Sequence, residues 1–166
     1  MDGGATQYTP IAAGVTLTLD IPSLGGGPQN ITFWAATSAT SGRVGDITFF
    51  DCYSNGVTSL DVSNATAIDY LVCSYNNLTS LDLSTNTALT YANCQNNNLT
   101  SLNLNGATAL TSLTCSDNNL TSLDLSTNTA LRYLYAPNNP LTGHFDASGI
   151  STGFTGIIVS LSLIHI

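Results

Sequence analysis

The middle of the chain repeats one pattern of apolar and polar residues every 21 positions. Each copy approximates L-x-x-L-x-C-x-x-N-x-L-T-S-L-D-L-S-x-N-T-A, and the copies begin at Ile47, Ile68, Leu89, Leu110 and Leu131. Within a copy, apolar and polar residues alternate over short spans such as 70–73 and 81–83. Such alternation predicts extended backbone with one buried face, and no stretch has the spacing of an amphipathic helix.

One copy has the parts of one solenoid coil: a strand, a corner at the asparagine, a second extended segment and a Ser/Thr/Asn turn. Parallel coils stack about 4.8 Å apart, so equivalent residues form ladders along the axis. A single coil cannot bury a core alone and takes its stability from stacked neighbours. The predicted fold class is an all-β-rich solenoid of parallel strands, with 21-residue coils and little or no helix.

The sixth position of the repeat is a cysteine in four copies and alanine in the fifth: Cys52, Cys73, Cys94, Cys115 and Ala136. A zinc site needs four converging sulfurs, which a column of thiols on parallel strands cannot supply. Disulfides between neighbouring coils fit the Cα spacing, but parallel Cβ vectors make their geometry poor. We interpret the cysteines as small buried hydrophobes, because alanine replaces one of them. No metal or cofactor is expected.

The ninth position is asparagine in every copy: Asn55, Asn76, Asn97, Asn118 and Asn139. A buried side-chain amide at each corner can hydrogen-bond to backbone groups of its own and adjacent coils. We therefore assign these residues a structural role.

Together, the leucine pattern, the 21-residue length and the cysteine at position six resemble bacterial leucine-rich repeat proteins of the internalin-J-like subfamily. The resemblance covers about 47–141. It implies a curved parallel β-solenoid with short strands on the concave side, and a role in adhesion or protein recognition. It also implies an extracellular or cell-surface location, although the first five residues lack the features of a secretion signal.

Residues 47–160 form the predicted solenoid, with five regular copies and an irregular last coil. In that coil His144 and Asp146 replace the expected leucines, so its second half is expected to fail. The pattern resumes over 154–159, two residues late. Residues 161–166 match the translation of a transposon end used to prepare sequencing libraries. We exclude them from functional argument and expect the chain to be a fragment of a longer protein.

Residues 1–46 do not follow the repeat. Alternation over 15–21 and an apolar run over 31–34 predict two strands. Because a solenoid needs its end coils covered, we interpret 1–46 as a β-rich cap with Trp34 over the first coil. A linker is the alternative.

Aromatic residues gather at positions three, five, seven and eight, which are expected to point outward from the concave strands. Tyrosine combines apolar contact area with a hydroxyl and is enriched in recognition surfaces, although aromatic residues are also good strand formers. The predicted binding residues are Phe49, Tyr53, Tyr70, Tyr75, Tyr91, Tyr133, Tyr135 and Arg132. Their expected polar rim is Asp51, Asn93, Gln95, Asp117 and Arg132.

Only 7% of the residues are charged and the formal net charge is −8, with no Lys and no Glu. This balance argues against binding to nucleic acid or to an anionic membrane, and no apolar run is long enough to span a membrane. An acidic ladder of Asp61, Asp82 and Asp124, with Asn103 between, is expected to face solvent. Calcium between coils is the alternative for this ladder.

The sequence contains no constellation of catalytic residues, so we predict a monomeric, non-enzymatic module that binds a protein or a glycan. Two alternatives stay open. One is a structural or ice-binding solenoid, suggested by threonine ladders at Thr58, Thr79, Thr100, Thr121 and Thr142 and at Thr66, Thr87, Thr108 and Thr129. The other is the targeting half of a larger effector enzyme.

Overall fold

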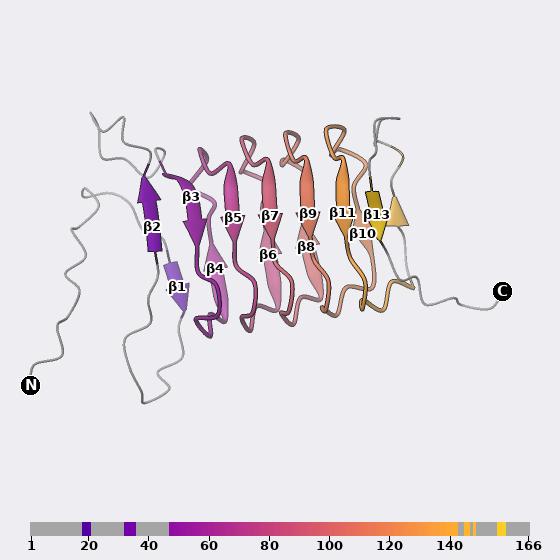
Figure 1. Ribbon diagram of the computed structural model, residues 1–166, viewed down its shortest axis with the longest axis horizontal. Coiled ribbons are helices and arrows are strands. Elements are labelled where there is room, and N and C mark those ends of the chain that lie inside the picture. The colour runs from indigo at the N-terminus through magenta and orange to yellow at the C-terminus, as the bar shows by residue number, and fades with distance from the viewer. Residues whose placement is uncertain are drawn as a thin grey trace, which may run out of the picture.

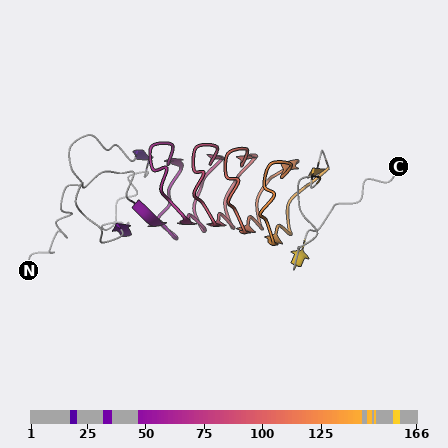
Figure 2. The same ribbon diagram turned by 90° about the horizontal axis from the view of Figure 1, so that it is seen from above.

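The computed structural model describes residues 18–20, 32–35, 47–142, 145–146, 148 and 156–158. These residues form strands and turns without a helix, in coils that follow one another along a single axis (Figures 1 and 2). The leucine-rich, parallel β-solenoid predicted from the sequence is confirmed.

One wall of the solenoid is a seven-stranded sheet with the order β13-β11-β9-β7-β5-β3-β2. Its five central strands are parallel and neighbours pair 21 residues apart, as Tyr70 does with Tyr91. Parallel pairing places identical repeat positions side by side, so the sequence period becomes a set of ladders. The central strands are β3 (Ile47–Asp51), β5 (Tyr70–Val72), β7 (Tyr91–Asn93), β9 (Ser112–Thr114) and β11 (Tyr133–Tyr135).

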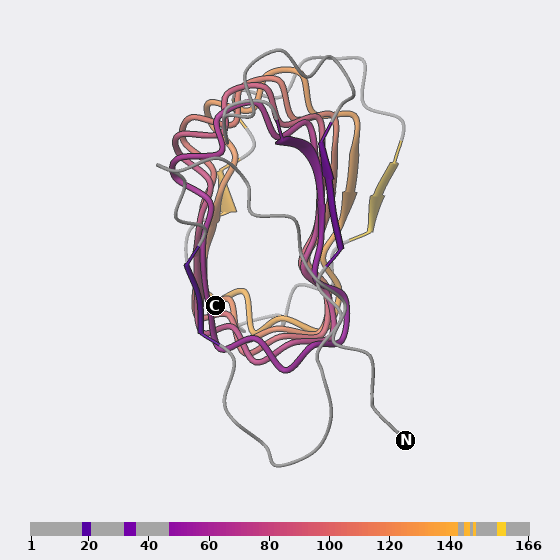
Figure 3. The ribbon, with the colours of Figure 1, turned by 90° about the vertical axis from the view of Figure 1, so that its left-hand side faces the viewer.

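The opposite wall carries the second extended segment of each coil (Figure 3). Here Ser and Asp or Asn flank a leucine that points inward, as at Leu60 and Leu81. The strands on this wall are β4 (Ser59–Asp61), β6 (Ser80–Asp82), β8 (Ser101–Asn103) and β10 (Leu123–Asp124).

The core lies between the two walls and is filled by the ladders that the repeat predicts. Its largest fully buried side chains are Phe50 in the first coil and leucines such as Leu99 and Leu113 in later coils. Leu102 on the second wall is only partly buried. Because every coil buries these residues against its neighbours, the stability of the fold is shared between coils.

The corner after the sheet wall is made by a residue with left-handed backbone in every coil. The five residues are Ser54, Tyr75, Asn96, Asp117 and Asn138, with φ between 52° and 59°. Asn and Asp tolerate this conformation better than most side chains, whereas a bulky tyrosine there is an outlier.

Two strands before the repeat extend the walls at the N-terminal side. β1 (Thr18–Asp20) pairs antiparallel with β4, and β2 (Thr32–Ala35) pairs antiparallel with β3. Both lie within or beside the segments expected to be strands. Whether 1–46 serves as a cap stays a prediction, because the side chain of Trp34 lies outside the described part of the chain.

The last coil departs from the expectation that its second half fails. β12 (Phe145–Asp146) pairs parallel with β10, and Phe145 lies opposite Leu123. The 21-residue period would have placed the preceding residue, His144, opposite Leu123. A one-residue shift of the chain therefore places Phe145 at the register position that a leucine occupies in the other coils, and a strand forms there. β13 (Gly156–Ile158) then pairs with β11, with Ile157 opposite Leu134. His144 and 161–166 lie outside the described residues.

Candidate functional site

The outer face of the seven-stranded sheet, called here the sheet face, presents a ladder of aromatic rings at position three. Phe49 and Tyr70 stack with ring centroids 5.1 Å apart and planes 12° apart. Tyr70 and Tyr91 stack more closely, at 4.1 Å and 7°. The parallel register produces this stack, because it sets the three side chains directly one above another. Burial and the neighbouring Tyr70 hydroxyl raise the pKa of Tyr91.

A second aromatic pair lies at the corner beside the sheet face. The rings of Tyr53 and Tyr75 are 5.3 Å apart and tilted by 57°, and the two side chains are 53% and 46% exposed. Tyr75 makes this contact from the left-handed backbone position that Ser, Asn or Asp occupies in the other coils. The structure thus holds a bulky residue in an unfavourable conformation at an exposed place.

Position seven does not point outward in every coil, contrary to the sequence analysis. Ser74 and Ser116 are each only 1% exposed at this position, whereas Tyr53 is exposed. A left-handed residue follows this position in every coil, so the difference accompanies the side chain: the short serines are buried and the longer tyrosine is exposed. The outward set is therefore position three, position five in part, and position eight.

Several residues of the expected polar rim are hydrogen-bonded within the chain. The Asp51 carboxylate accepts a bond from the N–H of Tyr53, and the Asp117 carboxylate accepts one from the Asn138 amide. The Gln95 N–H donates to the Asn93 side chain, and both residues are half-buried.

Two further predicted residues lie on the last regular coil. Tyr135 is half-buried in β11 and Arg132 is exposed just before that strand. The rim therefore combines fixed polar groups with one positively charged side chain.

The corner asparagines bind neighbouring coils together. The Asn97 amide donates to the carbonyl oxygens of Cys73 and Cys94, at 3.0 and 3.1 Å, and its oxygen accepts from the N–H of Leu78 at 3.0 Å. Asn76, Asn118 and Asn139 repeat this set. Asn55, in the first coil, is half-buried and donates to the carbonyl of Tyr53.

A second set of buried asparagines was missed by the sequence analysis. Asn86 donates to the carbonyls of Val62 and Ala65 in the preceding coil, and Asn128 donates to those of Leu104 and Ala107. Their side-chain oxygens are buried without a hydrogen-bond partner in the described structure. The signal that could have revealed them is an alternation of Ala and Asn at one repeat position.

The four cysteines are free and buried in the core. Burial raises the pKa of Cys52 and of Cys94 to about 12 and places the pKa of Cys73 and Cys115 well above the usual range. Reactivity requires the thiolate. These thiols are therefore suited to packing rather than to chemistry.

We expect the native protein to react with no equivalents of a thiol reagent such as DTNB at pH 8, and the unfolded protein to react with four, since the chain has four cysteines. The Asn98→Cys variant is the matched control, because residue 98 is exposed and its thiol would react at once. Native-state labelling as fast as that of the Asn98→Cys control would contradict this burial.

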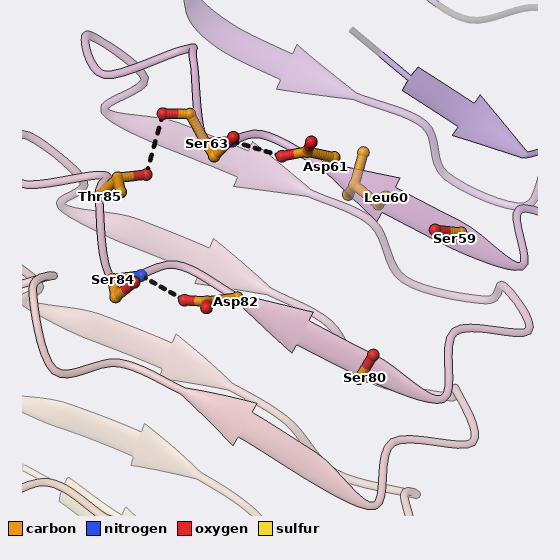
Figure 4. Close-up of a pocket in the computed structure, with 8 residues that line it drawn as sticks. All are labelled: Ser59, Leu60, Asp61, Ser63, Ser80, Asp82, Ser84 and Thr85. Carbon is orange, nitrogen blue, oxygen red and sulfur yellow. Dashed lines mark hydrogen bonds between the residues drawn. The ribbon is translucent and has the colours of Figure 1, made fainter.

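The acidic ladder on the opposite wall is engaged in local turns. Asp61 and Asp82 are exposed, and each accepts a hydrogen bond at 2.9 Å from the serine N–H two residues later. The serine hydroxyl and N–H lower the pKa of each carboxylate. A hollow between β4 and β6 is lined by Ser59, Leu60, Asp61, Ser63, Ser80, Asp82, Ser84 and Thr85 (Figure 4).

The described residues contain no group of three or more His, Cys, Asp or Glu side chains that could hold a metal ion. The same part of the chain has no helix of the length and hydropathy that a bilayer crossing requires.

No family model and no curated protein sequence matches the chain. Among solved structures, it is similar to the functional domain of InlJ from Listeria monocytogenes, described as including a cysteine ladder. The two are 36% identical and superpose with a TM-score of 0.65 over 72% of this chain. The match spans 26% of the InlJ chain, about a quarter of its length. The described coils from Ile47 onward therefore form a leucine-rich repeat solenoid with a buried cysteine ladder, similar to the domain of InlJ.

Proposed function

We propose that this protein is a non-catalytic binding module that recognises a protein ligand through the sheet face. The observation that carries the proposal is the aromatic ladder of Phe49, Tyr70 and Tyr91, whose rings stack outside the core. Tyr70 and Tyr133 remain 36% and 40% exposed. Aromatic rings supply large contact areas at little entropic cost and dominate the binding energy of interfaces.

The unfavourable backbone of Tyr75, at the corner beside the sheet face, also supports binding through this face. A tyrosine at φ 59° is less favourable than the Asn or Asp found at this position in later coils. Because the Tyr75 side chain is exposed, burial of its ring offsets little of this strain. Its position beside Tyr53 instead enlarges the aromatic surface at the edge of the sheet face.

Similarity to InlJ supports a binding role and a location at the bacterial surface. Adhesion would follow if the ligand belongs to another cell. A glycan ligand is the second candidate; aromatic rings also stack on sugars, but no contact among the described residues favours a glycan over a protein.

The test is binding of the full chain to an array that carries purified extracellular proteins and glycans. Replacing Tyr70, Tyr91 and Tyr133 together by Ser should weaken binding by at least about 100-fold, because hot-spot aromatics each contribute roughly 2 kcal/mol or more. The solenoid should still fold, since these rings lie outside the core. Circular dichroism would check that the variant melts cooperatively.

The matched control replaces Thr79, Thr100 and Thr121 by Ser. These residues form an exposed ladder away from the sheet face, so their truncation should leave binding unchanged. Saturable binding that survives the tyrosine substitutions, or binding to glycans alone, would contradict the proposal.

A further inference from the structure

The aromatic ladder at position three is interrupted by one small residue. Tyr91 pairs with Ser112 in β9, and Ser112 pairs with Tyr133 in β11. A serine therefore stands where the ladder would need its next ring, and an aromatic residue follows on the far side. Tyr91 and Tyr133 are two coils apart.

Tyr91 has one covered ring face, and Tyr133 has a close neighbour on the far side of the gap. Tyr70 stacks on one face of Tyr91 at 4.1 Å. On the other side of the gap, Tyr133 lies against Gly156, where an added Cβ would be 3.4 and 3.6 Å from two of its ring carbons. The uncovered face of Tyr91 lies on the side of Ser112, because Tyr91 pairs with Tyr70 on one side and with Ser112 on the other.

The gap matches the thickness of one flat ring. Coils are about 4.8 Å apart, so a ring inserted at the level of Ser112 would lie about that distance from each tyrosine. The existing steps of the ladder are 5.1 and 4.1 Å. A single aromatic ring would therefore continue the stack with the spacing it already has.

Two threonine hydroxyls beside the gap are used by the chain itself. The hydroxyl of Thr90 donates to the carbonyl of Asp69, and that of Thr111 donates to the carbonyl of Thr90, at 3.0 and 2.9 Å. A sugar would need several available hydrogen-bonding side chains around its ring. Two phenol rings, one on each side of the gap, with engaged neighbours favour an aromatic side chain instead.

We propose that the gap over Ser112, between Tyr91 and Tyr133, is a slot that receives one aromatic side chain of the protein ligand. This inference rests on the proposed function and specifies which part of the sheet face provides the anchor site. The inserted ring would complete a stack of five rings from Phe49 to Tyr133.

The slot can be tested with the full chain and a small probe, N-acetyl-tryptophanamide, in a saturation-transfer NMR titration. The wild type should give a saturable signal from the indole protons. Ser112→Tyr should fill the slot with the chain's own ring and weaken probe binding by at least about tenfold. Ser101→Tyr on β8 is the matched control: it adds the same ring to the opposite wall, where residue 101 is exposed, and should bind like the wild type.

A second variant keeps the test decisive if Ser112→Tyr folds poorly. Tyr133→Ser removes one wall of the slot and should also weaken probe binding by about tenfold. The slot is overturned if the wild type gives no saturable signal. It is equally overturned if Ser112→Tyr and Tyr133→Ser both bind the probe with the affinity of the wild type. It is also overturned if methyl β-glucopyranoside binds better than the indole.

The two proposals can fail separately. If Ser112→Tyr leaves capture of the protein ligand intact while the triple tyrosine variant abolishes it, the slot is wrong and the binding face stands. If the triple variant also retains the ligand, the proposed function is wrong as well.

Discussion

Replacing Asn97 by Ala is expected to lower the free energy of unfolding by about 3 kcal/mol. The Asn97 oxygen accepts from the buried N–H of Leu78, which has no alternative acceptor among its described bonds. The Asn97 amide also joins the carbonyls of Cys73 and Cys94, one in each of two coils. Alanine removes these links and leaves a buried donor without a partner.

The Asn98→Ala variant is the control for this experiment, because the Asn98 side chain is exposed next to Asn97. Its unfolding free energy should stay within about 0.5 kcal/mol of the wild type. Asn97→Asp should lower the unfolding free energy at least as much as Asn97→Ala. A carboxylate oxygen would then face the carbonyl oxygens to which the Asn97 amide nitrogen donates. Chemical denaturation measures all three, and equal stability of Asn97→Ala and Asn98→Ala would refute the bridging role.

Replacing Gly106 by Ala should also lower the unfolding free energy by about 3 kcal/mol, in the upper range for overpacking. A Cβ on Gly106 would overlap the carbonyl oxygen of Ser84 in the preceding coil. Because the obstructing atom belongs to the backbone, it cannot move aside as a flexible side chain could. The two coils would have to separate locally.

Gly56→Ala separates this contact from the general effect of replacing glycine. Gly56 has φ 68°, but a Cβ there meets nothing within 4 Å. Gly56→Ala should lower the unfolding free energy by only about 1 kcal/mol, because alanine is less favourable than glycine in left-handed backbone. Thermal unfolding followed by circular dichroism compares the two variants, and a smaller loss for Gly106→Ala than for Gly56→Ala would show that the close approach is not limiting.

The repeat alone would have misjudged Gly106. The equivalent residues in the neighbouring coils are Thr85 and Thr127, so a consensus argument would favour threonine at position 106. In the structure the coils differ at this turn: the Thr85 hydroxyl donates to the carbonyl of Ser63, whereas Gly106 lies directly against Ser84. Only the distance between two coils distinguishes these cases.

The sequence was more informative about the candidate binding face than about its details. The period placed Phe49, Tyr70 and Tyr91 on one ladder, and their rings do stack. It did not indicate that Ser74 would be covered at the corner, or that Tyr75 would have left-handed backbone. Both depend on how the chain turns after the strand, which the alternation of apolar and polar residues does not describe.

By itself, the sequence determined the fold, the coil length and the inward direction of the cysteines and leucines. It could do so because alternation fixes which side of a strand is buried, and a constant period fixes which residues lie above one another. Tertiary structure alone decided the slip at β12, where Phe145 lies opposite Leu123 one residue later than the period predicts, and the contact of Gly106 with Ser84. These features depend on the separation of atoms in adjacent coils, and a one-dimensional pattern carries no such distance.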